Sequence, residues 1–163
     1  MLEILKHNLG RLIDFSGRTA PKAFWLYFAV VLLTYMGALM ITMVPPLASH
    51  GAGPPNLQLF MGVNAACAVL AVLLLAASVT RRLHDSNRRG WWGLMPLPFL
   101  AGGLIGMSLL SFGLGDDSDA GTQLMALMLN NLIYLALLGL LVVFLCLPGT
   151  RGPNRFGDRP TLA

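Results

Sequence analysis

The densest polar cluster in the sequence spans residues 81–90 and reads Arg-Arg-Leu-His-Asp-Ser-Asn-Arg-Arg-Gly. Arginine side chains bind phosphate oxygens as two-pronged donors, and a carboxylate beside them can orient an arginine or a histidine. One interpretation is a pocket for a phosphate or an anionic lipid headgroup. The other is a topology signal whose arginines extend into the headgroup layer. The candidate residues are Arg81, Arg82, His84 and Asp85.

Other combinations of reactive residue types do not match known sites. His84 and Asp85 are adjacent, so on a helix they do not face each other. The histidines His7, His50 and His84 share no metal-ligand spacing, and the acidic residues at 116–119 fit a solvated loop. The sequence contains no phosphate-binding loop, nucleophile-elbow or zinc motif. We therefore expect no catalytic residue, metal or cofactor, and a protein that is not an enzyme.

Three asparagines are the strongest polar residues within long apolar runs: Asn64, Asn130 and Asn131. At 1.5 Å per residue, Asn64 and Asn130 lie at a similar depth, roughly 10–12 Å below the same end of their runs. Amide side chains hold membrane helices together through interhelical hydrogen bonds. We expect such a contact here. The alternative is a small polar ligand site or pore, with Tyr134 one turn from Asn130.

The elements that position these residues follow from composition. Of the 163 residues, 56% are hydrophobic and only 11% are charged, whereas soluble domains carry about 25% charged residues. A membrane span needs about 20 apolar residues. Four stretches meet this requirement without Asp, Glu, Lys or Arg, and they cover residues 23–44, 57–80, 91–113 and 122–147. The sequence predicts one all-α domain, a four-span helical bundle with a tail at 148–163.

Prolines and glycines indicate how these spans end and pack. The pair Pro45 and Pro46 predicts the end of the first span. Pro96 and Pro98 lie near the start of the third, where they are expected to loosen its first two turns. The spacing Gly102-x-x-x-Gly106 permits close helix packing in the same span.

The basic residues predict the orientation of the bundle. All 11 Lys and Arg residues fall in segments 1–22, 81–90 and 148–163, which lie on one side of the membrane. That side also holds four acidic residues, which leaves a net charge of +7, and the other three acidic residues are Asp116, Asp117 and Asp119. Because basic residues are enriched in cytoplasmic segments, both termini are predicted to face the cytoplasm. Residues 2–15 alternate apolar and polar positions with a helical period, which favours an interfacial amphipathic helix on the inner leaflet.

Three stretches together resemble a family of small bacterial inner-membrane proteins, the domain of unknown function 805 family. The first is Phe15-Ser-Gly-Arg18, with Trp25 seven residues later. The second is Arg81-Arg-Leu-His-Asp85 before Gly90-Trp-Trp92, and the third is Pro148-Gly-Thr-Arg-Gly-Pro-Asn154-Arg-Phe-Gly157 before Pro160. The resemblance implies an integral protein of the bacterial inner membrane, and it carries no established activity or catalytic residues.

All three stretches fall on the basic side, so we expect them to fold together. The tail would return to the 81–90 segment, Asp85 would pair with an arginine, and Asn154 would bond to backbone groups. The full candidate patch for a headgroup or phosphate comprises Arg18, Arg81, Arg82, His84, Asp85, Asn154 and Arg155. The expected partners are anionic membrane lipids, a membrane protein or further copies of the chain, and not nucleic acid.

We expect a structural, adaptor or envelope-response component whose basic face contacts anionic lipid or a membrane partner. One alternative is a small oligomeric transporter or channel. The absence of ionisable residues from the four apolar stretches disfavours ion-coupled transport. The other alternative is an enzyme that acts on a lipid phosphate through His84, Asp85 and arginines.

Overall fold

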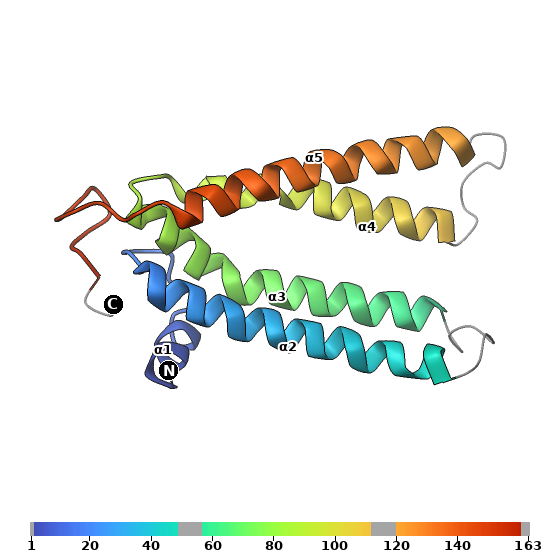
Figure 1. The fold of residues 1–163 in the computed structure, drawn as a ribbon, viewed down its shortest axis with the longest axis horizontal. Coiled ribbons are helices and arrows are strands. Elements are labelled where there is room, and N and C mark those ends of the chain that lie inside the picture. The colour runs from blue at the N-terminus through green and yellow to red at the C-terminus, as the bar shows by residue number, and fades with distance from the viewer. Residues whose placement is uncertain (1, 49–56, 112–119, 161–163) are drawn as a thin grey trace.

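A computed structural model describes residues 2–48, 57–111 and 120–160 of the protein, and these residues form four long helices and two short ones (Figure 1). In chain order they are α1 (Leu2–Leu9), α2 (Pro21–Ala48), α3 (Leu57–Asp85), η1 (Gly90–Leu94), α4 (Leu97–Ser111) and α5 (Ala120–Cys146). Four segments are long and apolar enough to cross a membrane: Pro21–Thr42, Gly62–Asp85, Gly90–Leu110 and Gly121–Cys146. The predicted all-α fold with four spans and a short N-terminal helix is confirmed.

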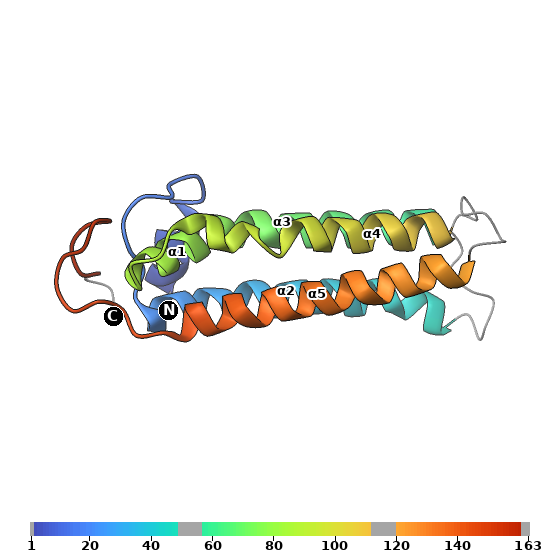
Figure 2. The ribbon, with the colours of Figure 1, turned by 90° about the horizontal axis from the view of Figure 1, so that it is seen from above.

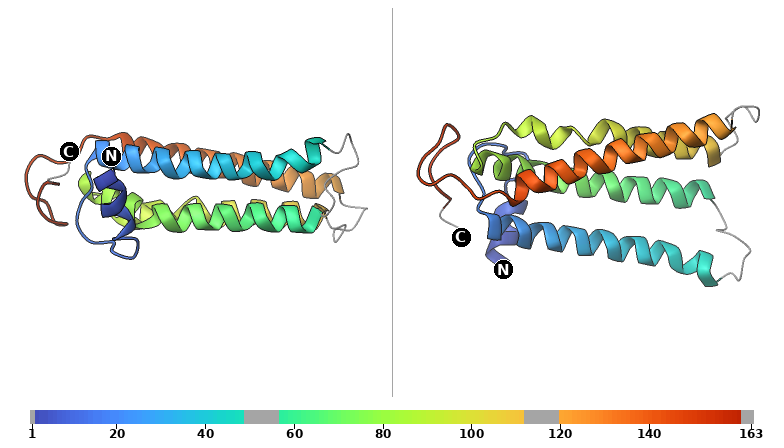
Figure 3. Two further views of the ribbon diagram at one scale, coloured as in Figure 1. Left: turned by 90° about the horizontal axis from the view of Figure 1, so that it is seen from below. Right: turned by 45° about the horizontal axis from the view of Figure 1, so that its top comes forward.

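The long helices form two hairpins. α2 packs along α3, and α4 packs along α5 (Figures 1 and 2). The hairpins meet through η1 and the end of α5, which both contact α3. Figure 3 shows that the N-terminal helix and the C-terminal tail lie at this same end of the molecule. Residues 112–119, which include the predicted acidic loop, lie outside the described residues.

The end of α3 differs from the prediction. We expected the helix to stop at Thr80 and the 81–90 segment to be a loop, whereas α3 continues through Asp85. It closes with a left-handed residue, Asn87 (φ 58°), whose N–H bonds to the His84 carbonyl while the Arg88 N–H bonds to the Leu83 carbonyl. This is the Schellman pattern, in which asparagine can replace glycine. The first half of the cluster, residues 81–85, therefore belongs to the last turn and a half of a helix.

Three further boundaries depart from the expected ones. α1 ends at Leu9 instead of residue 15, because Gly10 is followed by turns rather than by further helix. α2 continues past Pro45 and Pro46 to Ala48, so the predicted stop at those prolines is wrong. The predicted loosening at the start of the third span is confirmed, since that span begins as the 3₁₀ helix η1 and becomes α-helical only at Leu97.

The best-buried part of the molecule is the end where the hairpins meet. Its apolar cluster contains Phe24, Leu83, Leu141 and Leu145, against which Trp92 and other partly buried side chains pack. Yet the largest fully buried side chains in the described chain are Arg81 and Arg82. Along the spans, by contrast, many large apolar side chains are exposed, as in a protein whose solvent is lipid. We call residues 8–20, 81–90 and 145–160 at this end the cap.

Candidate functional site

Asp85 lies at the centre of the cap. Arg18 donates to its Oδ1 from Nε (3.0 Å) and Nη2 (2.8 Å), and Arg82 donates to its Oδ2 from Nη1. All three residues are buried, with Asp85 2% and Arg82 0% exposed. One carboxylate thus balances two buried guanidinium groups, which leaves an excess positive charge and several N–H donors that need other acceptors.

Arg18 uses its remaining donors on the C-terminal tail. Its guanidinium donates to the carbonyls of Thr150 (2.8 Å), Gly152 (2.7 Å) and Gly157 (3.3 Å). Gly152 and Gly157 both have positive φ, at 88° and 123°, a conformation that glycine adopts without strain. These two glycines let the tail curl so that three carbonyl oxygens converge on one side chain.

Arg82 closes the end of α5. Its Nε donates to the Leu145 carbonyl at 3.0 Å, and its Nη2 donates to the Leu147 carbonyl. The last carbonyls of a helix have no intrahelical partner and form the negative end of its dipole. The Arg82 guanidinium supplies hydrogen-bond donors to carbonyls at this end and a positive charge beside the negative end of the dipole. Arg82 therefore joins α3 of the first hairpin to α5 of the second.

Arg81 holds the segment that follows α1. It donates to the carbonyls of Arg11 (2.8 Å) and Asp14, to Asn8 Oδ1 (3.0 Å) and to Thr19 Oγ1 (3.2 Å). The Thr19 N–H returns to the Arg81 carbonyl at 3.1 Å. Neighbouring arginines on α3 thus fix different parts of the chain: Arg81 the N-terminal segment and Arg82 the end of α5.

The tail docks on the last turn of α3 through its backbone. The Thr150 N–H donates to the Asp85 carbonyl at 2.9 Å, and Asn154 Nδ2 donates to the His84 carbonyl at 3.0 Å. Gly149 lies against the Asp85 carboxylate so closely that a Cβ there would overlap both of its oxygens. The contact therefore requires glycine at position 149.

Aromatic and cationic side chains complete this docking. The rings of His84 and Phe156 stack with centroids 3.8 Å apart and an interplanar angle of 3°. His84 Nδ1 lies 3.2 Å from the Gly17 carbonyl. Arg155 donates to the Asn87 carbonyl at 2.9 Å while its guanidinium lies over the Phe156 ring. His84 therefore touches both the N-terminal segment and the tail.

The structure brings all seven residues of the predicted patch to the cap. The predicted pairing of Asp85 with an arginine and the predicted backbone contact of Asn154 are both present. The arginine donors, however, point at backbone carbonyls of this chain, and Arg18, Arg81 and Arg82 are buried. Binding of an anion by these residues remains a prediction.

Several cap residues were not among those predicted from the sequence, namely Asn8, Thr19, Gly149, Thr150 and Phe156. Asn8 and Thr19 accept from Arg81 through neutral side-chain oxygens, and the other three contribute backbone groups, small size or ring stacking. Such roles leave no signal in charge or spacing. The three tail glycines, at 149, 152 and 157, are the feature of the sequence from which an unusual backbone in this segment could have been predicted.

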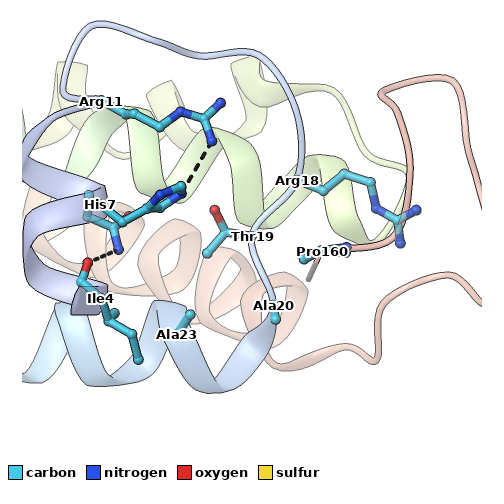
Figure 4. A pocket seen from close by; sticks show the side chains of 9 residues that line it. Ile4, His7, Arg11, Arg18, Thr19, Ala20, Ala23 and Pro160 are labelled. Carbon is cyan, nitrogen blue, oxygen red and sulfur yellow. Dashed lines mark hydrogen bonds between the residues drawn. The ribbon is translucent and has the colours of Figure 1, made fainter. Parts of the chain in front are cut away.

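A small hollow of about 100 Å³ lies between α1 and the start of α2 (Figure 4). Arg11 and His7 face each other across its edge, with Arg11 Nη1 3.3 Å from His7 Nε2, whereas Arg18 points away toward the tail.

The surroundings of His7 and Asp14 shift the pKa of both. Partial removal from water, followed by the charges of Arg11 and Arg81, lowers the pKa of His7. The hydroxyl of Ser16, then the Arg11 guanidinium, hold the pKa of Asp14 far below its usual value. This segment is fixed by local charge and hydrogen bonds.

The asparagines serve the two hairpins separately. Asn64 accepts a hydrogen bond from Thr42 of α2 at 3.3 Å, and Asn130 donates to the Phe99 carbonyl of α4 at 2.9 Å. Asn131 bonds within its own helix, to the Leu127 carbonyl, so its expected interhelical role is replaced by an intrahelical one. The similar depth of Asn64 and Asn130 suggested that they bond to each other. Depth, however, does not determine which helices are neighbours.

Four apolar spans joined at one end by a polar, buried cap define a small helical membrane protein. The chain belongs to the family described as protein of unknown function DUF805, which it matches over residues 12–158. This range includes all three stretches on which the family resemblance was based, from Phe15 to Gly157, and the resemblance is confirmed.

Two relatives from Escherichia coli (strain K12) are similar over nearly their whole length. The chain is 28% identical over 162 residues to the inner membrane protein YhaH, covering 99% of this chain and 95% of YhaH. It is 26% identical over 164 residues to the inner membrane protein YhaI, covering 98% of this chain and 92% of YhaI. No solved structure matches it. The protein is a multi-pass protein of the inner membrane.

Proposed function

We propose that the protein is a non-enzymatic structural or adaptor component of the inner membrane, and that its cap presents a fixed basic surface to anionic lipid or to a membrane partner. One observation carries the proposal. The buried arginines Arg18, Arg81 and Arg82 direct their donors at Asp85 and at polar groups of the N-terminal segment, α5 and the tail. These contacts hold the N-terminal segment, α3, the end of α5 and the tail together.

The same observation argues against the enzyme alternative. A lipid-phosphate enzyme needs arginine donors aimed at an open reaction site and a histidine free to attack or to transfer a proton. Here each guanidinium nitrogen of Arg18, Arg81 and Arg82 already donates to an acceptor of this chain. The His84 ring lies flat against Phe156 with Nδ1 beside a carbonyl. At this end of the molecule the exposed basic side chains are instead Lys6, Lys22, Arg89, Arg151, Arg155 and Arg159.

Orientation is part of the proposal. The end that carries both termini also carries every described lysine and arginine. By the bias of basic residues toward the cytoplasm, we infer that the cap is cytoplasmic. Fusion of green fluorescent protein after Ala163 should give fluorescent cells, and alkaline phosphatase at the same position should be inactive. The reverse result would place the cap in the periplasm.

The functional proposal is tested with purified protein in nanodiscs of phosphatidylcholine alone or with 30% phosphatidylglycerol. We expect the tail to resist chymotrypsin at Phe156 in both, and anionic lipid to raise the thermal stability. Release of phosphate from a lipid phosphate, abolished by His84→Ala, would overturn the non-enzymatic assignment. Solute flux into liposomes that is abolished by Asn64→Leu or Asn131→Leu would favour the transporter alternative.

A further inference from the structure

A second hollow, of about 540 Å³, opens between the start of α2 and the C-terminal tail. Its size lies within the range of ligand sites, about 300–1,000 Å³. Lys22 lines it from α2, and Arg151 and Arg159 line it from the tail. Arg18 and Asp85, the centre of the cap, also line it. The docked tail thus brings three basic side chains together from two distant parts of the sequence.

These three cations differ from the buried arginines. Lys22, Arg151 and Arg159 are all exposed. In the described part of the chain, the ion pairs join Arg11 to Asp14, and Arg18 and Arg82 to Asp85, so none involves these three residues. None of the three makes a side-chain hydrogen bond within the described residues either. Their donors are available to a ligand.

The charge around the hollow favours an anion. The Asp85 carboxylate in its wall is already bound by two guanidinium groups, and Asp158 neighbours Arg159 in sequence. The wall nevertheless keeps a positive excess from Lys22, Arg151 and Arg159. The first turn of α2 lies at the same place, and the N-terminus of a helix is the positive end of its dipole.

The position of the hollow points to the membrane surface. The first span begins at Pro21 and the fourth ends at Cys146. Lys22 is in the first turn of one span, and Pro148, which also lines the hollow, is two residues beyond the other. Because Lys22 and Pro148 lie so close to the ends of their spans, we infer that the hollow lies at the depth of lipid headgroups, where basic side chains meet anionic phosphates.

We propose that this hollow is a binding site for a phosphate-bearing anion, held by Lys22, Arg151 and Arg159. Arginine forks and a lysine point charge are the groups that bind phosphate oxygens in proteins. The inference rests on the proposed function, since the site exists only while the tail is docked. The same chemistry would accept the phosphodiester of an anionic lipid or a free phosphate, and the two sources are separated experimentally.

The test compares two double variants that remove equal charge from this end of the molecule. Arg151→Gln with Arg159→Gln changes the hollow, whereas Lys6→Gln with Arg89→Gln removes two exposed cations of the same basic surface that do not line the hollow. Native mass spectrometry in mild detergent measures bound lipid after addition of phosphatidylglycerol or phosphatidylcholine. We expect the unchanged protein to retain phosphatidylglycerol and the hollow variant to lose at least about tenfold in affinity for it, since one charged hydrogen bond is worth that much. The control should lose clearly less, because its two cations contribute only to the general charge of the surface.

The second arm uses inorganic phosphate alone. A phosphate-dependent rise in melting temperature, absent from the hollow variant and without retention of phosphatidylglycerol, identifies a soluble anion as the ligand. Retention of phosphatidylglycerol without a response to phosphate identifies the lipid. Equal loss in both double variants, or no binding in either arm, overturns the site.

Chymotrypsin cleavage at Phe156 separates this outcome from failure of the proposed function. If the tail stays protected while neither anion binds, only the site is wrong. If the tail of the unchanged protein is cleaved rapidly, the tail is not docked in the cap, and the proposed function fails together with the site.

Discussion

At the scale of single residues, the cap depends on the balance between Asp85 and the two guanidinium groups that contact it. A buried ion pair adds little stability by itself, but removal of one member leaves the other charge in a medium that solvates it poorly. Asp85 serves two cations at once, so its loss leaves two such charges. The energetic consequence should exceed that of any exposed pair, such as Arg11 with Asp14.

The corresponding prediction concerns Asp85→Asn. The amide keeps the size of the side chain but removes its charge, so we expect the free energy of unfolding to fall by about 3–5 kcal/mol, as measured by denaturation in a single detergent. Asp158→Asn, an exposed tail position, is the matched control and should change stability by less than about 0.5 kcal/mol. Similar losses in the two variants would contradict the central role of Asp85.

His7 gives the N-terminal segment a pH dependence. Because the pKa of His7 is lowered in the folded protein, the unfolded or undocked chain binds more protons at mildly acidic pH. The contribution of His7 to docking of α1 is therefore complete above about pH 6.5 and declines as the pH falls below that value. Asp14, whose pKa is also lowered, acts in the same direction but only below about pH 4.

We expect amide hydrogen exchange in α1, corrected for its intrinsic pH dependence, to accelerate by up to about tenfold from pH 7.5 to pH 5.5. His7→Gln should remove this change, because glutamine does not titrate in that range. Persistence of the change in the variant would assign it to another group, such as His84, the other histidine of the described residues.

At the scale of elements, the second hairpin packs closely because two glycines of α4 face α5. In the second hairpin a Cβ on Gly106 would lie 2.8 Å from Leu127 Cδ2, and one on Gly102 would lie 3.0 Å from Asn130 Oδ1. The spacing of these glycines, predicted from the sequence to allow close packing, indeed faces α5. The absence of side chains there brings α4 near enough for Asn130 to reach the Phe99 carbonyl.

Gly106→Leu should therefore force α4 and α5 apart. We expect a loss of about 1–3 kcal/mol, the usual cost of overpacking, measured by thermal unfolding. Gly37→Leu in α2 is the control, since a Cβ there meets no atom within 4 Å. The tail should remain protected from chymotrypsin in both variants, because the described contacts of the cap with α5 lie in the last two turns of that helix. Loss of that protection in Gly106→Leu would show that the hairpin and the cap are not independent.

The elements also show how far sequence reasoning reaches. Span location could be predicted because an apolar run of sufficient length has one stable state in lipid. The end of α3 could not, because Arg81 and Arg82 are accommodated in a helix only by carbonyls more than 60 residues away. The pairing of Asp85 with an arginine was predictable from charge and orientation. The acceptors of Arg18 were not, since they are backbone oxygens placed by the left-handed glycines of the tail.

At the scale of the whole molecule, the two hairpins meet mainly at the cap, and the tail is part of that junction. The tail lies outside all four spans, yet it supplies three of the acceptors of Arg18 and covers the Asp85 carboxylate. Its docking should therefore stabilise the first hairpin, with which it shares no continuous element. Water would replace some of these hydrogen bonds if the tail were absent, so only part of their energy would be lost.

Truncation after Leu147 tests this coupling. We expect it to lower the stability of the first hairpin by about 2 kcal/mol or more, the scale of one or two charged hydrogen bonds. The loss should appear as faster hydrogen exchange at the start of α2 and the end of α3. Truncation after Pro160 keeps every described cap contact and should leave exchange unchanged. A synthetic peptide of residues 148–160 should restore protection to the shorter protein, because the docking contacts lie within those residues. Equal exchange in the two truncated proteins would mean that the tail rests on the first hairpin without stabilising it, and the cap would then be a feature of the arginines and Asp85 alone.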